Sequence, residues 1–193
     1  IGTNKLPQII TAMRQQIIDC GGEFLFEKKV IDFNIVKQEI SSVKTEDGDI
    51  FEADAFILAT GHSARDIFKL LFQKKILLEA KAFALGVRIE HPQELIDNIQ
   101  YHCPKRDTHL PPASYSLVKQ INERGVFSFC MCPGGIIAPA ATSAGELVVN
   151  GWSPSKRNNP FANSGMVVQI ELNDVIKNEK LKIKNDALAM MYF

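Results

Sequence analysis

Small and polar residues follow a short apolar run in the segment Asp54–Ser63, which reads Asp-Ala-Phe-Ile-Leu-Ala-Thr-Gly-His-Ser. The run from 54 to 59 predicts a buried parallel strand, and ligands bind at the carboxyl ends of such strands. Thr60 offers a hydroxyl there, Gly61 an amide that a ligand can approach closely, and His62 a neutral imidazole that can donate a hydrogen bond. The segment therefore predicts a phosphate or ribose contact; an ordinary strand-to-helix turn with a serine cap is the alternative.

A second group of chemically useful residues lies at Phe129–Gly135, which reads Phe-Cys-Met-Cys-Pro-Gly-Gly. Cys130 and Cys132 would share one face of a strand. A zinc site needs about four ligands and no second cysteine pair is present, so we predict no metal and favour two small core residues over zinc or a redox disulfide. The bare backbone of Gly134 and Gly135 is expected to lie against a flat ring.

Charged and amide side chains mark two further places. Arg88 and His91, together with Glu90, can form a polar cluster for an anionic substrate, and a salt-bridged strand end is the alternative. The polar segment 152–164 predicts a loop, and binding residues gather on loops. The end of this segment and the glycine after it supply three candidate binding residues, Asn163, Ser164 and Gly165, although any polar connection has a similar composition.

Composition narrows the class of protein. Lys plus Arg and Asp plus Glu both number 22, so the formal net charge is zero, which argues against a nucleic-acid binder. No apolar stretch approaches the ~20 residues of a membrane span, so no membrane partner is expected. The first residues show no secretory pattern, and the four cysteines are too scattered for a disulfide scaffold. We therefore expect a cytoplasmic protein.

Periodicity and turn residues predict the elements that must position these groups. Helical spacing over residues 5–20 ends at a Gly-Gly pair, and an Asp47-Gly48 hairpin signal lies within a β-rich stretch at 30–52. The other expected helices cover 63–73, 92–99 and a stretch from 186 onward, and the other expected strands cover 24–26, 82–90, 114–120, 126–132, 136–138, 147–151 and 166–172.

Several long strings of this sequence resemble one family. The strings IGTNKLP, ILATGHSARDIF, AFALGVRIEHPQELID and FCMCPGGIIAPAATSAGELVVNGWSPSKRNNPFANSG are similar to those of the FAD-dependent, NAD(FAD)-utilising dehydrogenases, a family of largely uncharacterised bacterial flavoproteins with a glutathione-reductase-like FAD fold. The resemblance implies FAD as cofactor and NAD(P)H as a candidate electron donor. It places Val30 near the adenine, Thr60 and Gly61 near the pyrophosphate, and the two later glycine-containing segments, 133–135 and 163–165, on the isoalloxazine side.

The function expected from this resemblance is an internal domain of a FAD-dependent oxidoreductase, a dehydrogenase or reductase of unknown substrate. His62, Arg88 and His91 are its candidate catalytic residues, because each could polarise flavin or substrate. A module that binds a metabolite or a protein partner without redox turnover is the alternative.

The expected architecture is mixed α/β or α+β. Residues 1–80 should form part of a FAD-binding layer with a β meander, 81–164 an inserted, mainly antiparallel β cap, and 165–193 a return segment. No G-x-G-x-x-G occurs in the 193 residues, so we expect this chain, as a fragment, to bind FAD weakly or not at all. Apolar surface left exposed on the fragment is expected to favour dimers.

Overall fold

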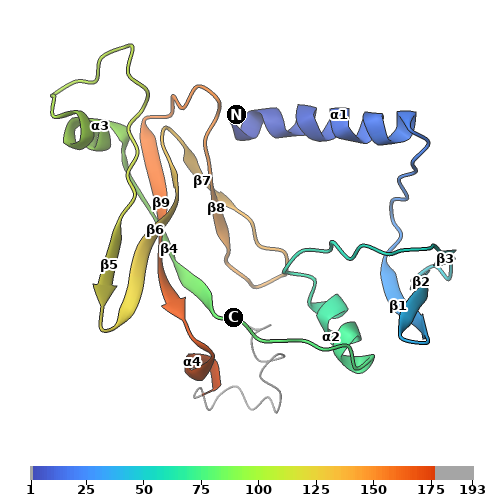
Figure 1. Ribbon diagram of the computed structural model, residues 1–193. Helices are drawn as coiled ribbons and strands as arrows, with labels where there is room; N and C mark the ends of the chain where they lie inside the picture. Colours follow the sequence, from blue (N-terminus) through green and yellow to red (C-terminus); the bar gives the residue numbers. More distant parts are fainter. Residues whose placement is uncertain (1, 177–193) are drawn as a thin grey trace. The chain divides into compact units, whose positions relative to one another are not determined.

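A computed structural model describes residues 2–176 of the chain (Figure 1). It divides into two compact units: Ile1–Gln16 with Ala82–Asp174 form the first, and the second contains Ile17–Lys81. All strand pairs in the described residues are antiparallel, and a few helices accompany them. The mixed α+β class is therefore confirmed. None of the described helices has the length and apolar character that crossing a bilayer requires.

The helices agree closely with the sequence pattern. They are a 3-10 turn at Thr3–Lys5, α1 (Leu6–Asp19), α2 (Arg65–Gln73), α3 (Gln93–Tyr101) and the short α4 (Leu172–Ile176). The α1 helix ends where predicted, since Gly21 takes a positive φ of 85° and the Gly22 amide donates back to the Ile17 carbonyl at 2.9 Å. No side chain caps α2, whose preceding residue is Ala64, so the serine cap of the alternative interpretation is absent. The helix expected from residue 186 lies outside the described residues.

The second unit contains the predicted meander. Its strands β1 (Val30–Val36), β2 (Glu39–Thr45) and β3 (Ile50–Glu52) pair in sequence order. Gly48, with φ at 96°, turns the chain between β2 and β3, and its amide donates to the Thr45 carbonyl at 3.0 Å. Among the described residues of this unit, Phe33 on β1 and Ile67 on α2 are the buried apolar side chains.

Two predicted strands of the second unit are absent. Residues 24–26 and 54–59 carry no strand, and Ile57 is 93% exposed. A parallel strand obtains its hydrogen bonds and its burial from neighbouring strands. Among the described residues no strand pairs with either segment, so the apolar pattern alone does not produce a strand.

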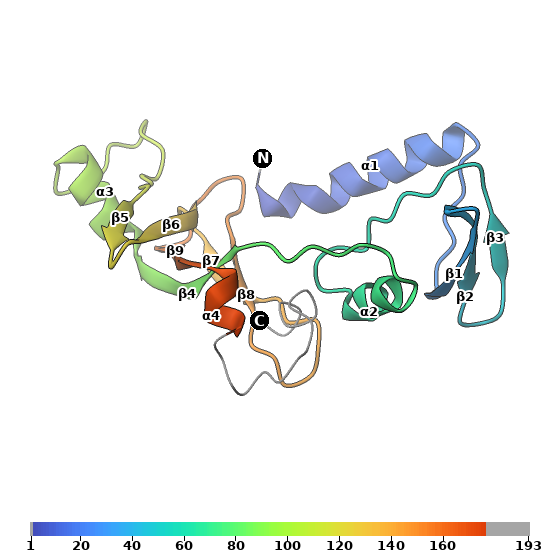
Figure 2. The ribbon, with the colours of Figure 1, turned by 60° about the horizontal axis from the view of Figure 1, so that its bottom comes forward.

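The first unit is built on a four-stranded antiparallel sheet in the order β4-β9-β6-β5. A separate two-stranded ribbon pairs β7 with β8. Both views show α3 beside the end of the sheet where β4 ends and β9 begins (Figure 1, Figure 2). The strands are β4 (Phe83–Pro92), β5 (Val118–Ile121), β6 (Arg124–Cys132), β7 (Ile136–Pro139), β8 (Val149–Trp152) and β9 (Phe161–Ile170).

The first residues of β9 correct one prediction. The sequence predicts a loop throughout 152–164, but Trp152 ends β8 and the last residues of the segment, from Phe161, form β9. Asn163 and Ser164 are 0% exposed there. The reason is long-range: β9 pairs with β4 on one side and β6 on the other, and these contacts bury side chains that their own neighbours in sequence would leave in a loop.

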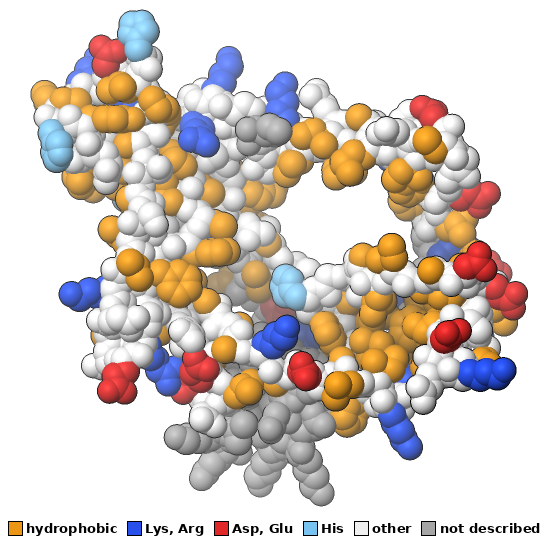
Figure 3. All heavy atoms as spheres, viewed as in Figure 1, with side chains coloured by type: hydrophobic (Ala, Val, Ile, Leu, Met, Phe, Trp, Pro, Cys, Tyr) orange, Lys and Arg blue, Asp and Glu red, His pale blue; other side chains and the backbone are white. Residues whose placement is uncertain are grey.

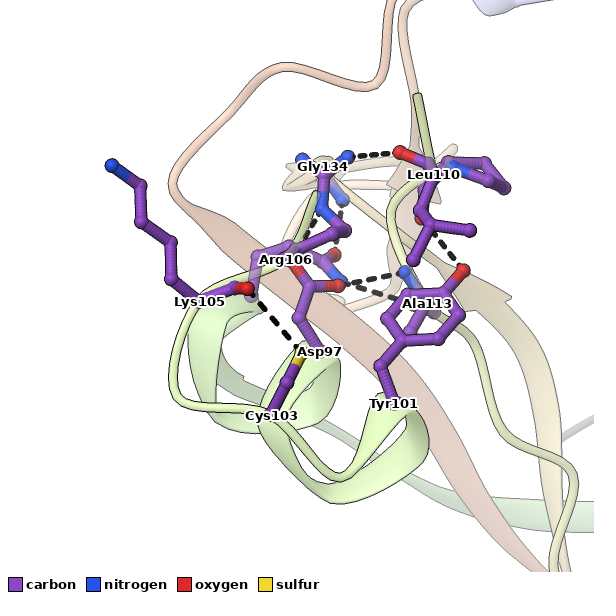
Figure 4. Close-up of polar contacts among 10 residues, drawn as sticks. Asp97, Tyr101, Cys103, Lys105, Arg106, Leu110, Ala113 and Gly134 are labelled. Atoms are coloured by element: carbon purple, nitrogen blue, oxygen red, sulfur yellow. Dashed lines mark hydrogen bonds and ion pairs between the residues drawn. The ribbon is translucent and has the colours of Figure 1, made fainter. Parts of the chain in front are cut away.

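A buried carboxylate holds the loop after α3 in place. Asp97 is 5% exposed and accepts hydrogen bonds from the Ala113 amide at 2.8 Å, the Gln93 side chain at 2.8 Å and Arg106 Nε at 2.7 Å (Figure 4). The side-chain oxygen of Gln93, Oε1, in turn accepts a hydrogen bond from the Gly134 amide at 2.7 Å. One carboxylate thus connects the loop to the Pro-Gly-Gly turn.

This network makes a pH-dependent contribution to stability. Burial alone would raise the pKa of Asp97, but the hydrogen bonds from Ala113, Gln93 and Arg106 outweigh it and lower the pKa. A lowered carboxyl pKa in the folded state gives stability that is present above the unfolded pKa of about 4 and is lost as the pH falls through the folded pKa.

We predict that Asp97→Asn lowers the free energy of unfolding by about 1–3 kcal/mol at pH 7, because it weakens hydrogen bonds to a buried charge. Urea unfolding between pH 7 and pH 3 measures it. The difference between the two proteins should shrink as the pH falls below about 4. A difference that stays constant over this range would contradict the assignment.

Candidate functional site

Arg88 on β4 is the centre of the most unusual polar arrangement in the first unit. Its guanidinium reaches across β9 to β6 and donates from both terminal nitrogens to the Cys130 carbonyl, each at 3.2 Å. It also donates to the Asn163 side-chain oxygen and lies 3.8 Å from the sulfur of Cys132. We call these four residues, Arg88, Cys130, Cys132 and Asn163, the Arg88 centre.

A β-bulge in β6 makes this arrangement possible. Phe129 pairs with Gly165 and Cys132 pairs with Asn163, so β6 has one more residue than β9 between these pairs. Cys130 takes a φ of +46°, which is uncommon for a residue other than glycine. The bulge thereby supplies the Cys130 carbonyl that Arg88 contacts. Cys130 is exposed, so the expectation that both cysteines are core residues on one strand face is wrong.

Asn163 is fully buried and only half satisfied. Its carbonyl oxygen accepts from Arg88, but its side-chain nitrogen has no hydrogen-bond partner among the described residues. A buried donor left without an acceptor costs about 1–3 kcal/mol. Such a group in a native fold calls for an explanation, and an acceptor supplied by a ligand is one.

The charge of Arg88 is also uncompensated. Its partners in the described part of the chain are a carbonyl, an amide oxygen and a thiol, and none of them is a carboxylate. The guanidinium is half-buried, where a charge without a counterion is unfavourable. A cation without a counterion and an amide nitrogen without an acceptor thus lie beside each other among the described residues. Chemically, this pair suits an electron-rich or anionic oxygen.

A glycine on β8 leaves room for the guanidinium. A Cβ atom at Gly151 would overlap the Arg88 guanidinium and would lie 2.5 Å from the Asn163 oxygen. A second glycine, Gly165 on β9, is the cross-strand partner of Arg88. The absence of side chains at these two positions lets Arg88 cross the sheet.

Other predicted residues of the first unit have different surroundings. His91 lies an odd number of residues from Arg88 on a regular strand, so the two side chains project from opposite faces of β4. The His91 ring is 5.6 Å from that of Tyr115, and burial lowers its pKa. Its Nε2 atom is buried without a partner in the described residues. The predicted cluster of Arg88 with His91 is therefore wrong.

The Pro-Gly-Gly turn is buried within the first unit. The Gly134 amide donates to Gln93, and the Gly135 amide donates to the Phe161 carbonyl at 2.9 Å. Both turn amides thus have acceptors inside the chain.

Ser164 lies on the opposite face of β9 from Asn163. Its hydroxyl donates to the Gly165 carbonyl at 3.0 Å.

The remaining predicted residues lie in the second unit. Thr60, Gly61 and His62 are exposed in a segment without regular structure, and Gly61 has a φ of +79°. A Cβ atom at Gly61 would meet no other atom within 4 Å, so the space beside this turn is open among the described residues. Val30 begins β1.

Two features of the Arg88 centre do not follow from the sequence: the place of Gly151 beside Arg88 and the backbone conformation of Cys130. The sequence predicts Gly151 only as the end of a strand at 147–151, with no role beside Arg88. The positive φ of Cys130 has no local signal, because cysteine is not a typical turn residue. A glycine within the β-rich pattern near 147–151 was the available clue, since glycine in a strand often marks the close approach of another group.

Comparison with known proteins identifies the class. Residues 82–193, more than half of the chain, match the family described as "FAD-dependent protein, C-terminal domain-like". The chain belongs to this family of domains of FAD-dependent proteins. It is also 40% identical over 176 residues to a Clostridium beijerinckii protein described as "Uncharacterized protein". That alignment covers 90% of this chain and 33% of the relative, so the chain spans about a third of that protein's length.

The Arg88 centre fits a group of the kind that this family implies. FAD carries phosphate oxygens and carbonyl oxygens on its flavin ring. The centre offers a cation without a counterion and a buried amide donor without an acceptor among the described residues. The fit rests on these donors rather than on the buried turn amides.

We predict that Gly151→Ala displaces the Arg88 guanidinium and lowers the free energy of unfolding by about 1–3 kcal/mol, because the added methyl group has no room. Urea denaturation measures the change. Gly125→Ala is the matched control, since its Cβ would meet only the Gln120 side chain, at 3.8 Å. Equal effects of the two substitutions would show that Arg88 is not held tightly at Gly151.

Proposed function

We propose that this chain is a domain of a FAD-dependent oxidoreductase and that its Arg88 centre binds an electron-rich oxygen of the flavin ring. The family match supports the cofactor. The uncompensated charge of Arg88 and the unpartnered side-chain nitrogen of Asn163 are the observation that supports the contact. When bound, FAD supplies two-electron chemistry. The finer identity, a dehydrogenase or a reductase that draws electrons from NAD(P)H or another donor, belongs to the same proposal.

The protein's contribution would be electrostatic. Arg88 holds a fixed positive charge, and Cys130 and Asn163 keep its guanidinium in one orientation before any ligand arrives. A preorganised cation stabilises the state of a bound group that carries more negative charge. Asn163 donates the second hydrogen bond from a position closed to water, where its amide can be satisfied only by a group that enters the centre.

The other predicted contacts remain part of the proposal. Val30 is assigned to the adenine, Thr60 and Gly61 to the pyrophosphate, and His62 to a flavin or phosphate oxygen. Gly134, Gly135, Ser164 and Gly165 are assigned to the isoalloxazine side, where the two turn glycines would act through backbone shape because their amides are already bonded.

We expect Arg88→Met in the natural protein at full length to weaken FAD binding about tenfold or more and to lower the two-electron midpoint potential of bound FAD by about 30–60 mV. Loss of a fixed positive charge destabilises the reduced, more negative flavin. Fluorescence titration with FAD and a spectroscopic redox titration measure the two effects. Arg88→Lys should fall between wild type and Arg88→Met, because it keeps the charge without the planar fork.

Lys119→Met on the exposed strand β5 is the matched control, since it removes the same charge from the first unit away from the centre. FAD affinity and potential that are unchanged in Arg88→Met would contradict the proposed contact. A full-length protein that holds no FAD would contradict the proposed function itself and would favour a binding module without redox turnover.

The absence of the glycine-rich phosphate fingerprint from these 193 residues leads to a separate expectation. FAD should bind the 193-residue chain far more weakly than it binds the natural protein at full length, because backbone amides at a helix N-terminus usually hold the phosphates. Titration of both proteins with FAD compares them. Equal affinities would show that most of the binding energy lies within residues 1–193.

A further inference from the structure

A large groove in the first unit is distinct from the Arg88 centre. It has a volume of about 1090 Å³ and lies between the start of α1, the β7–β8 ribbon and the loop that follows β8. All of its lining residues belong to the first unit. Small-molecule sites usually have volumes of about 300–1,000 Å³, so the groove is large enough for an organic ligand.

The lining of the groove has no charge. Charged residues make up 23% of the chain, yet none lines the groove. Aliphatic side chains, three prolines and the ring of Trp152 provide its apolar walls, and Leu6 and Ile10 of α1 are 49% and 60% exposed. Figure 3 shows hydrophobic side chains exposed along α1. An ion would lose its hydration there without gaining a counterion, so the lining selects against charged ligands.

Hydrogen bonds fix the two sides of the groove to each other. The Thr3 amide donates to the Ser153 carbonyl at 2.9 Å, and the Asn4 side-chain oxygen accepts from the Ser155 amide at 2.9 Å. Gly2 is buried against Ser155, where a Cβ atom would lie 2.6 Å from the Ser155 Cα. The groove is therefore a built feature of the unit.

Most polar groups in the lining already have partners. Ser153 Oγ donates to the Pro133 carbonyl, Thr11 Oγ1 donates to the Pro7 carbonyl, and Asn159 Oδ1 accepts from the Phe161 amide. Within the described residues, the Trp152 indole N–H and the Asn158 side-chain amide have no hydrogen-bond partner. These two groups remain to orient a ligand, and the indole can donate to an acceptor on it.

We infer that this groove binds an uncharged organic molecule with a flat, apolar ring and a hydrogen-bond acceptor at its edge. The apolar walls contribute most of the affinity, and Trp152 contributes both a ring face and a donor. The inference goes beyond the proposed FAD contact, because it rests on different residues and holds whether or not the Arg88 centre binds flavin.

A pair of probes that differ in charge tests this inference. The probes are 4-nitroanisole, which is neutral, and 4-nitrobenzenesulfonate, which is an anion. Trp152 is the only tryptophan of the chain, so saturable quenching of its fluorescence in the 193-residue chain reports binding at the groove itself. Calorimetric titration of the natural protein at full length, loaded with FAD, repeats the measurement. We expect the neutral probe to bind at least about tenfold more tightly than the sulfonate in both proteins.

Two variants on α1 locate the binding. Ile10→Glu places a carboxylate in the lining and should weaken binding of the neutral probe about tenfold or more. Met13→Glu is the matched control on the same helix: Met13 is 55% exposed and does not line the groove, so this variant should bind like wild type. Circular dichroism verifies that both variants keep their helix content.

Three results would each overturn the inference. One is equal binding of the two probes, and another is binding that Ile10→Glu leaves unchanged. The third is binding seen in the 193-residue chain but lost in the FAD-loaded protein at full length, since the groove would then be covered by flavin or by other parts of the protein. None of these results depends on whether Arg88 contacts the flavin, so failure here is separable from failure of the proposed function.

Discussion

The Arg88 guanidinium carries a full positive charge into a setting whose hydrogen-bond partners are all neutral among the described residues. Three features of the first unit position this side chain. The bulge in β6 presents the Cys130 carbonyl, β9 buries Asn163, and β8 passes close by because residue 151 is a glycine. A half-buried cation without a counterion lowers stability, so its presence is more easily understood if a ligand brings the missing acceptor.

Local signals predicted the elements that depend on local physics. The helical spacing and Gly-Gly stop of α1 and the Asp47-Gly48 turn of the meander were both readable, because neighbours in sequence form these contacts. The apolar run at 54–59 failed as a strand, since hydrogen bonds from neighbouring strands decide whether such a run forms one. The prediction for the first part of β9 was wrong in the opposite direction. The sequence predicts a loop there, but pairing with distant strands forms a strand and buries its polar residues.

In the candidate site, too, the sequence identifies single residues, whereas long-range contacts decide which of them meet. Arg88 and Asn163 were both selected from sequence, but for unrelated reasons: one as part of a charged strand end, the other as part of a polar loop. The sheet order β4-β9-β6 brings them together, and no spacing along the chain announces that order. The positive φ at Cys130 and the close approach at Gly151 follow from the same long-range packing. The first has no signal in the sequence, and the second has only the weak one of a glycine within a β-rich pattern.

Asn163→Asp tests the central claim most directly, because the substitution should weaken FAD binding without lowering the free energy of unfolding. The new carboxylate would pair with Arg88 and remove the unpartnered amide nitrogen, so the free energy of unfolding should be unchanged or higher. The same change would place a negative charge where an electron-rich oxygen is expected, so FAD affinity of the full-length protein should fall about tenfold or more. Lower stability together with unchanged FAD affinity would show that the Arg88 centre is complete without a ligand.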